Sequence, residues 1–97
     1  MYIVFLRFSK NKSRAGEFMA AHNDWIESGF AEGVFLVVGS LQPQLGGAVV
    51  AHNTTRDELE MRIREDPFVA QDVVRAELVE IAPSKADPRV DFLLSPR

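Results

Sequence analysis

AAHNDWI, residues 20–26, lies inside the longest helix that the sequence predicts. Counting along that helix, Phe18 comes four residues before His22, while Trp25 and Ile26 come three and four residues after it. Residues with this spacing share one helix face. His22 therefore belongs to the apolar stripe that we expect to pack on a sheet. An ionisable ring in that position needs a polar partner, because burial without one costs free energy.

The segments around this helix predict the remaining elements of the first half. A polar turn at 9–12 leads into the helix, with Ser13 as its cap and Gly29 or Gly33 as its stop. Apolar runs rich in β-formers predict strands. These strands are expected at residues 1–8, 34–41, 48–51 and 73–81, with a turn at 42–47.

A second helix begins at Thr55, which forms a capping-box pattern with Glu58. Leu59 and Ile63 lie on its inner face. Asp66 comes three residues after Ile63 and belongs to the same face. Pro67 follows and disfavours helical backbone at Asp66, so we expect a separate short helical piece at 68–70.

The order β-α-β-β-α-β predicts an α+β, ferredoxin-like fold with an antiparallel sheet. We expect one domain over residues 1–97, of which 84–97 form a C-terminal tail. The second strand is apolar on both faces, with Val34, Leu36 and Val38 on one and Phe35 and Val37 on the other. Helices cover only one sheet face, so a homodimer packed sheet to sheet is predicted. The tail either docks on the partner or folds back on its own sheet.

Composition excludes several classes of protein. The net charge is −3 without a basic cluster, which argues against nucleic-acid binding. The absence of cysteine excludes disulfides, cysteine nucleophiles and zinc-thiolate sites, and it fits a cytoplasmic protein. The apolar run at the N-terminus is too short to span a membrane and lacks the pattern of a signal peptide, so no membrane partner is expected.

His22 and Asp66 point from two helices toward the same side of the sheet, so the two side chains are able to meet. A carboxylate at one imidazole nitrogen sets the tautomer and supports the protonated ring, while the other nitrogen transfers a proton. Structural interpretations remain open beside this one. His22 also fits a satisfied core histidine, and Asp66-Pro67 fits a helix cap followed by proline at the first position.

Other kinds of site find less support in the sequence. His52 ends a strand and is interpreted as a solvated turn residue. The two histidines lack metal-ligand spacing, and no Gly-x-Ser-x-Gly elbow is present. Gly46-Gly47 fits a hairpin turn rather than a phosphate loop. We therefore expect neither a metal nor a cofactor.

Three features resemble the YCII-related family. They are His22 in the first helix, Gly39-Ser40 with Pro43 after the second strand, and Asp66-Pro67-Phe68 after the second helix. The resemblance spans about the first four-fifths of the chain. It implies a dimeric α+β barrel in which His22 and Asp66 face each other in a cleft as the active pair.

The resemblance also implies a small-molecule ligand, and relatives of this fold isomerise, dehydrochlorinate or oxygenate small aromatic-derived compounds. Trp25, Ser40 and Phe68 are the candidate substrate-binding residues, although the core is the more common place for a tryptophan such as Trp25. The chain departs from the family pattern where many members carry a basic residue before the histidine, and where Gly39-Ser40 replaces Gly-Pro. A ligand-binding or regulatory module without catalysis is the alternative function.

Overall fold

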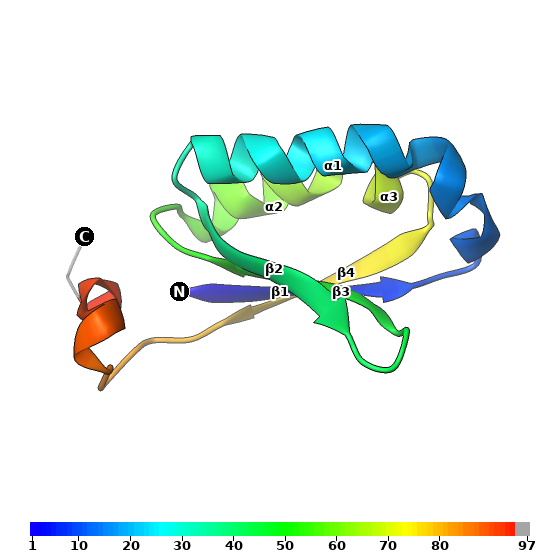
Figure 1. The fold of residues 1–97 in the computed structure, drawn as a ribbon. Coiled ribbons are helices and arrows are strands. Elements are labelled where there is room, and N and C mark those ends of the chain that lie inside the picture. Colours follow the sequence, from blue (N-terminus) through cyan, green and yellow to red (C-terminus); the bar gives the residue numbers. More distant parts are fainter. Residues whose placement is uncertain (95–97) are drawn as a thin grey trace.

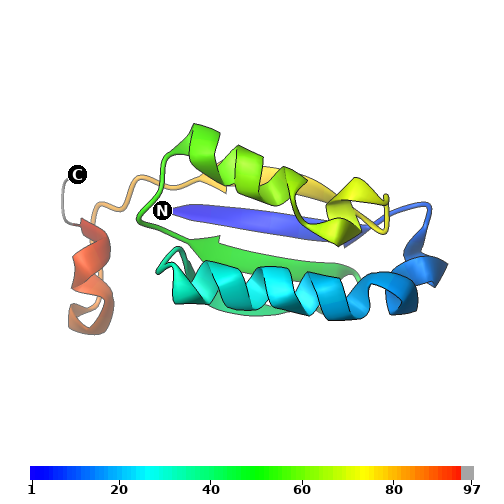
Figure 2. The same ribbon diagram turned by 90° about the horizontal axis from the view of Figure 1, so that it is seen from above.

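The computed structural model describes residues 1–94. A four-stranded sheet forms one layer, and three helices form a second layer on one of its faces (Figures 1 and 2). The elements in chain order are β1 (Tyr2–Phe8), a 3₁₀ turn η1 (Lys12–Arg14), α1 (Ala15–Ala31), β2 (Phe35–Leu41), β3 (Gly46–Ala51), α2 (Arg56–Arg64), α3 (Pro67–Ala70), β4 (Val74–Glu80) and a second 3₁₀ segment η2 (Pro88–Leu94).

The strand order is β2-β3-β1-β4, and all neighbouring strands are antiparallel. β1 is therefore central and is paired along its whole length with β4. This is the ferredoxin-like α+β arrangement that the sequence predicts. The predicted hairpin of the second and third strands is also confirmed, although β3 starts two residues earlier than expected.

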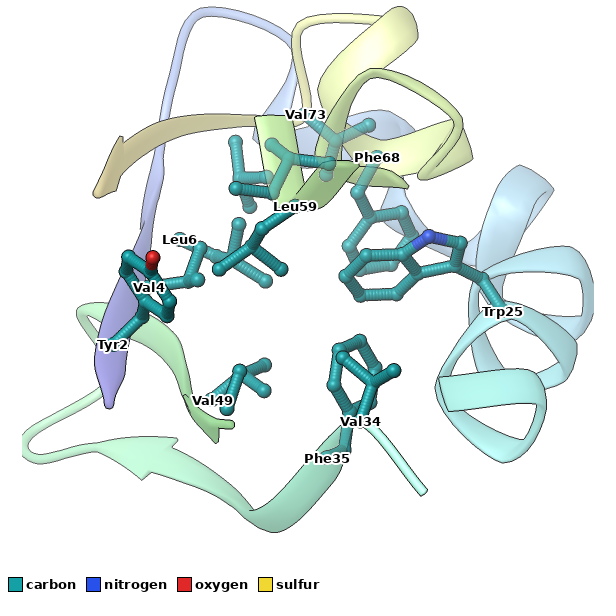
Figure 3. Close-up of a cluster of buried hydrophobic side chains, with 13 residues drawn as sticks. Tyr2, Val4, Leu6, Trp25, Val34, Phe35, Val49, Leu59, Phe68 and Val73 are labelled. Carbon is teal, nitrogen blue, oxygen red and sulfur yellow. The ribbon is translucent and has the colours of Figure 1, made fainter. Parts of the chain in front are cut away.

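The core lies between the helices and the facing side of the sheet (Figure 3). Alternate residues of β1 point into it, and the side chains at Val4 and Leu6 are 1% and 4% exposed. Leu59 and Val73 meet them from the helical layer and are fully buried. This packing holds α1 and α3 at fixed positions above the sheet.

The opposite face of the sheet carries no helix among residues 1–94 (Figure 1). Val37 is 58% exposed and Val79 is 38% exposed there, while Ile3 and Phe5 are only half-buried. Apolar residues therefore occupy both faces of the sheet, as expected, but one of the two apolar faces is open. We refer to these four residues as the open apolar face.

Ser13 is not the cap of the first helix, contrary to prediction. It lies within the 3₁₀ turn η1, and the residue preceding α1 is Arg14, which makes no capping hydrogen bond through its side chain. Arg14 instead forms an ion pair with Glu17, with 3.0 Å between Nε and Oε2. The helix starts one residue later than a cap at Ser13 would give, because the 3₁₀ turn takes up residues 12–14.

Of the two glycines proposed as the helix stop, Gly33 has that role. Its φ is +75°, and its N–H donates to the carbonyl of Phe30 at 3.0 Å. Gly29 lies inside α1 and has a packing function. A Cβ at Gly29 would lie 2.2 Å from the ring of Phe35, so only glycine allows β2 to approach the helix this closely.

A β-bulge between Phe35 and Val37 changes the predicted faces of β2. Simple alternation places Phe35 and Val37 together, opposite Val38. In the structure, Phe35 is buried in the core, and Val38 pairs with the buried Val49, whereas Val37 is exposed. Because the bulge inserts one residue, the next side chain that points into the core is that of Val38 and not that of Val37.

The tail extends beyond the end of the sheet and does not cover the open apolar face (Figures 1 and 2). η2 leaves Phe92 46% exposed, and the ring of this residue lies 5.5 Å from that of His52. Folding back on the chain's own sheet is therefore not observed for residues 84–94. The last three residues of the predicted tail, 95–97, lie outside the described part. No helix within residues 1–94 is long and apolar enough to cross a membrane.

Candidate functional site

His22 and Asp66 meet at the junction of α1 and α3. Asp66 is the N-cap of α3, with Pro67 at the first helical position, and its Oδ1 accepts a hydrogen bond from the backbone N–H of Phe68 at 3.0 Å. The same oxygen lies 2.7 Å from Nδ1 of His22. The sequence-predicted pair is therefore brought into direct contact, and the structural cap proposed for Asp66 is present as well.

Burial makes this contact strong. The side chain of Asp66 is fully buried, and that of His22 is 12% exposed. Within residues 1–94, Oδ2 of Asp66 has no hydrogen-bond partner, so Oδ1 alone accepts both bonds. A buried carboxylate is costly without such donors. An ionised Asp66 requires a proton on Nδ1 of His22, which leaves Nε2 as the basic nitrogen.

Aromatic stacking fixes the plane of the imidazole. The ring of Phe68 lies parallel to that of His22, with centroids 3.9 Å apart and an interplanar angle of 3°. Trp25 stacks more distantly, with 5.9 Å between its ring and that of His22. The imidazole is thus oriented by one hydrogen bond and one close stacking contact, which is the kind of preorganisation that proton transfer requires.

His22 lines a cavity of about 270 Å³ between α1 and the sheet. Two of the three predicted substrate-binding residues, Ser40 and Phe68, line the same cavity. Most of the other walls are apolar and come from β1, β2, β3 and α1. Of the residues that the structure describes, His22 alone brings an ionisable side chain to the lining. The cavity can therefore hold a small, largely apolar molecule against the imidazole.

Trp25, the third predicted substrate-binding residue, is not part of this cavity lining. Its side chain is buried in the core, where its Nε1 donates to the carbonyl of Arg62 at 2.8 Å and its ring meets that of Phe35 edge to face (Figure 3). The indole is large enough to bridge α1 and α2, and it is part of the hydrophobic core. We therefore do not assign Trp25 a substrate contact.

Met19, Asn23 and Leu6 line the cavity, although sequence reasoning did not single them out. Met19 precedes His22 by three residues, so helical spacing alone could have placed it there. Leu6 comes from β1, and no local pattern relates it to His22. His52 was interpreted as a solvated turn residue, but it is only half-exposed and contacts Phe92.

No group of three or more potential metal-ligating side chains occurs in the described range 1–94. His22 and Asp66 bind each other and do not form part of such a cluster. Within residues 1–94, the site therefore consists of the hydrogen-bonded pair His22 and Asp66, the stacked ring of Phe68 and one cavity.

Comparison with known proteins gives one family and one solved structure. A model of the YCII-related domain matches residues 1–83. No curated protein was found to match the sequence. The fold is similar to that of 5-chloro-2-hydroxyhydroquinone dehydrochlorinase from Burkholderia phenoliruptrix, solved in complex with 2,5-dihydroxybenzoquinone. The TM-score is 0.67 at 15% identity, over 84% of this chain and 93% of that chain.

Proposed function

The chain belongs to the YCII-related domain family, and from that premise we propose that it is an enzyme that moves a proton on a small organic molecule. His22 is the acid–base residue in this proposal, and Asp66 orients it. The observation that carries the proposal is the 2.7 Å contact between Nδ1 of His22 and Oδ1 of Asp66 beside an apolar cavity of about 270 Å³. The dehydrochlorinase with a similar fold makes a hydroxylated, ring-shaped substrate a reasonable first choice.

The proposed chemistry follows from the tautomer. Nε2 of His22 takes a proton from a carbon or hydroxyl group of the substrate, and the Asp66 carboxylate stabilises the imidazolium that forms. The imidazolium then returns the proton to another atom of the substrate, which gives isomerisation. Where the substrate carries a leaving group such as chloride, its departure after proton removal gives elimination instead. Neither route needs a cofactor.

The two predicted contacts that line the cavity have distinct roles in this proposal. The ring of Phe68 continues the stacked surface of His22 and would lie against a planar substrate. The hydroxyl of Ser40 supplies a hydrogen-bonding group among otherwise apolar walls. Together they would orient a flat molecule toward the imidazole.

Turnover of a panel of hydroxyhydroquinones, chlorinated hydroxyhydroquinones and lactones tests the proposal. His22→Gln should lower kcat by about 10²–10⁴-fold, the usual contribution of a general acid–base residue. His52→Gln is the matched control, because His52 does not line the cavity. Full turnover in the His22 variant, or equal losses in the two variants, would contradict the proposal.

A ligand-binding module without catalysis is the second candidate. It is favoured by the cavity lining, in which His22 is the only ionisable side chain among residues 1–94, so these residues offer no second acid or base to a reaction. In that case, His22→Gln would weaken binding of a compound that the protein never converts. Binding titrations beside the turnover assay separate the two candidates.

We propose in addition that two copies of the chain pair through the open apolar face in the cytoplasm. The exposed Val37 and Val79 support the pairing, and the lack of cysteine supports the location. Val37→Lys should give a monomer in light scattering. Met61→Lys is the control, because Met61 on α2 is equally exposed, at 58%. A parent protein that is already monomeric would end this part of the proposal.

A further inference from the structure

A polar groove adjoins the apolar cavity at the end of the β2–β3 hairpin. Lys12 from η1 lines it together with Gln42 and Gln44 from the hairpin turn. Phe8, Ser40 and Gly46 line both the groove and the apolar cavity. The two spaces therefore adjoin each other, with the apolar one at His22 and the polar one at Lys12.

Gly46 lines both spaces, and a side chain at this position would collide with the backbone of β1. Its φ is +128°, and a Cβ at this position would lie 2.0 Å from the carbonyl oxygen of Leu6. No other residue fits there without moving β1 or β3. Gly46 therefore lets β1 and β3 pair closely beside the residues that the two spaces share.

Among residues 1–94, Lys12 is the only lysine or arginine that lines either space. Its ammonium lies 4.7 Å from the ring centroid of Phe8, and the described residues place no carboxylate within ion-pair distance of it. Neighbouring cations differ in this respect. Lys10 pairs with Asp72 at 3.5 Å, and Arg14 pairs with Glu17. The charge of Lys12 is therefore available to a ligand.

We infer that Lys12 selects a substrate that carries an anionic group on a planar ring. The ring occupies the apolar cavity beside His22 and Phe68, and the anion, a carboxylate or an ionised enol, lies in the groove at Lys12. The position of the ring beside His22 is taken from the proposed function, and the inference rests on it. This arrangement keeps the charge where water still reaches it, because an anion deep in the apolar cavity would lose its solvation without a compensating cation.

Gln42 and Gln44 complete the polar end. Their side-chain amides can donate hydrogen bonds to an anion, and they carry no charge that would repel it. Lys12 is a specificity-determining residue in this inference. It lies outside the cavity that contains His22 and takes no part in proton transfer.

Binding of two nearly isosteric probes, 4-hydroxybenzoate and 4-hydroxybenzamide, tests the inference by NMR titration of the whole protein. The parent protein should prefer the benzoate. Lys12→Met should weaken benzoate binding about fivefold, as expected for one solvent-exposed charge pair, and leave benzamide binding unchanged. Lys10→Met is the control, because it removes the same charge two residues away but outside both spaces.

Equal losses in the two lysine variants would overturn the inference, because they would show a general effect of net charge. Equal affinity of the parent for the two probes would overturn it as well, and so would the absence of binding of both at millimolar concentration. These outcomes are separate from failure of the proposed function. That function fails if His22→Gln retains full turnover, whatever the preference for an anion.

Discussion

Two helix starts in this protein use the same local chemistry with different results. Thr55 caps α2 by accepting a hydrogen bond from the N–H of Glu58 at 3.1 Å. Asp66 caps α3 by accepting one from the N–H of Phe68 at 3.0 Å. In sequence, both are ordinary caps. In the structure, Thr55 is exposed, whereas Asp66 is fully buried and also contacts His22 of another helix.

The difference shows that capping geometry alone does not make a site. The capping box of α2 is closed within four residues, because the side chain of Glu58 in turn accepts a hydrogen bond from the N–H of Thr55 at 3.2 Å. The cap of α3 takes its second partner from 44 residues earlier in the chain. Because Asp66 is fully buried, its carboxylate needs this hydrogen bond from His22, and His22 also lines the cavity. Four predictions test this contrast.

Removing the buried cap should have the largest effect on stability. Asp66→Ala deletes the N-cap bond, which is worth about 1 kcal/mol, and leaves Nδ1 of a largely buried His22 without a partner, which costs about 1–3 kcal/mol. We expect the free energy of unfolding to fall by about 3 kcal/mol in urea denaturation. A loss below about 1 kcal/mol, the size expected of a cap alone, would show that the contact with His22 contributes no stability.

Removing the exposed cap should cost less. Thr55→Ala deletes one side of the capping box and should lower the free energy of unfolding by about 1 kcal/mol. The substitution leaves the cavity residues in place, so ligand binding should not change. Urea denaturation at the same protein concentration measures the first effect, and a ligand titration checks the second. A loss as large as that of Asp66→Ala would remove the contrast between the two caps.

Asp66→Asn separates the charge of the buried cap from its hydrogen bonds. Because Oδ1 accepts both bonds and Oδ2 accepts none within residues 1–94, the amide oxygen of asparagine can take the place of Oδ1. Stability should therefore stay within about 1 kcal/mol of the parent. Turnover should fall about 10²-fold, because the neutral amide no longer stabilises the imidazolium. Unchanged turnover would show that the charge has no catalytic role.

An exposed ion pair should show the smallest effect and the clearest pH dependence. Arg62 donates to Glu32 and lowers the pKa of that carboxyl, first through the hydrogen bond and then through its charge. A carboxyl whose pKa is lower in the folded than in the unfolded state stabilises the fold at pH values above its unfolded-state pKa. This stabilisation is lost as the pH falls through the folded-state pKa. Glu32→Gln should thus slightly lower the melting temperature at neutral pH. A difference from the parent that persists in strong acid would contradict this assignment.

Most of the fold follows from local patterns. Apolar runs predict all four strands, and the capping box of α2 is present as expected, because each depends on residues that are neighbours in sequence. The errors occur where a tertiary contact acts on a local preference. Ser13 lies in a 3₁₀ turn and is not the cap of the first helix. The bulge after Phe35 reverses the expected alternation of buried and exposed side chains in β2.

The candidate site divides in the same way. His22 and Asp66 are predicted from helical spacing, because a polar residue on an apolar face is visible in sequence. Trp25 shares that face but lies in the core, which helical spacing cannot distinguish from a place in the cavity wall. Lys12 and Gln44 come from a turn and a hairpin that show no pattern linking them to His22, and only the fold brings them to the edge of the cavity.

The sequence by itself determined the order of the elements, the capping box and the choice of His22 and Asp66 as a candidate pair. These depend on periodicity and on short-range hydrogen bonds, which the order of the residues specifies directly. The tertiary structure decided that Asp66 reaches His22, that His22 lines a cavity, and that Lys12 lines the adjoining groove. Those depend on how α1 and α3 pack across the sheet, and packing joins residues that no local rule relates.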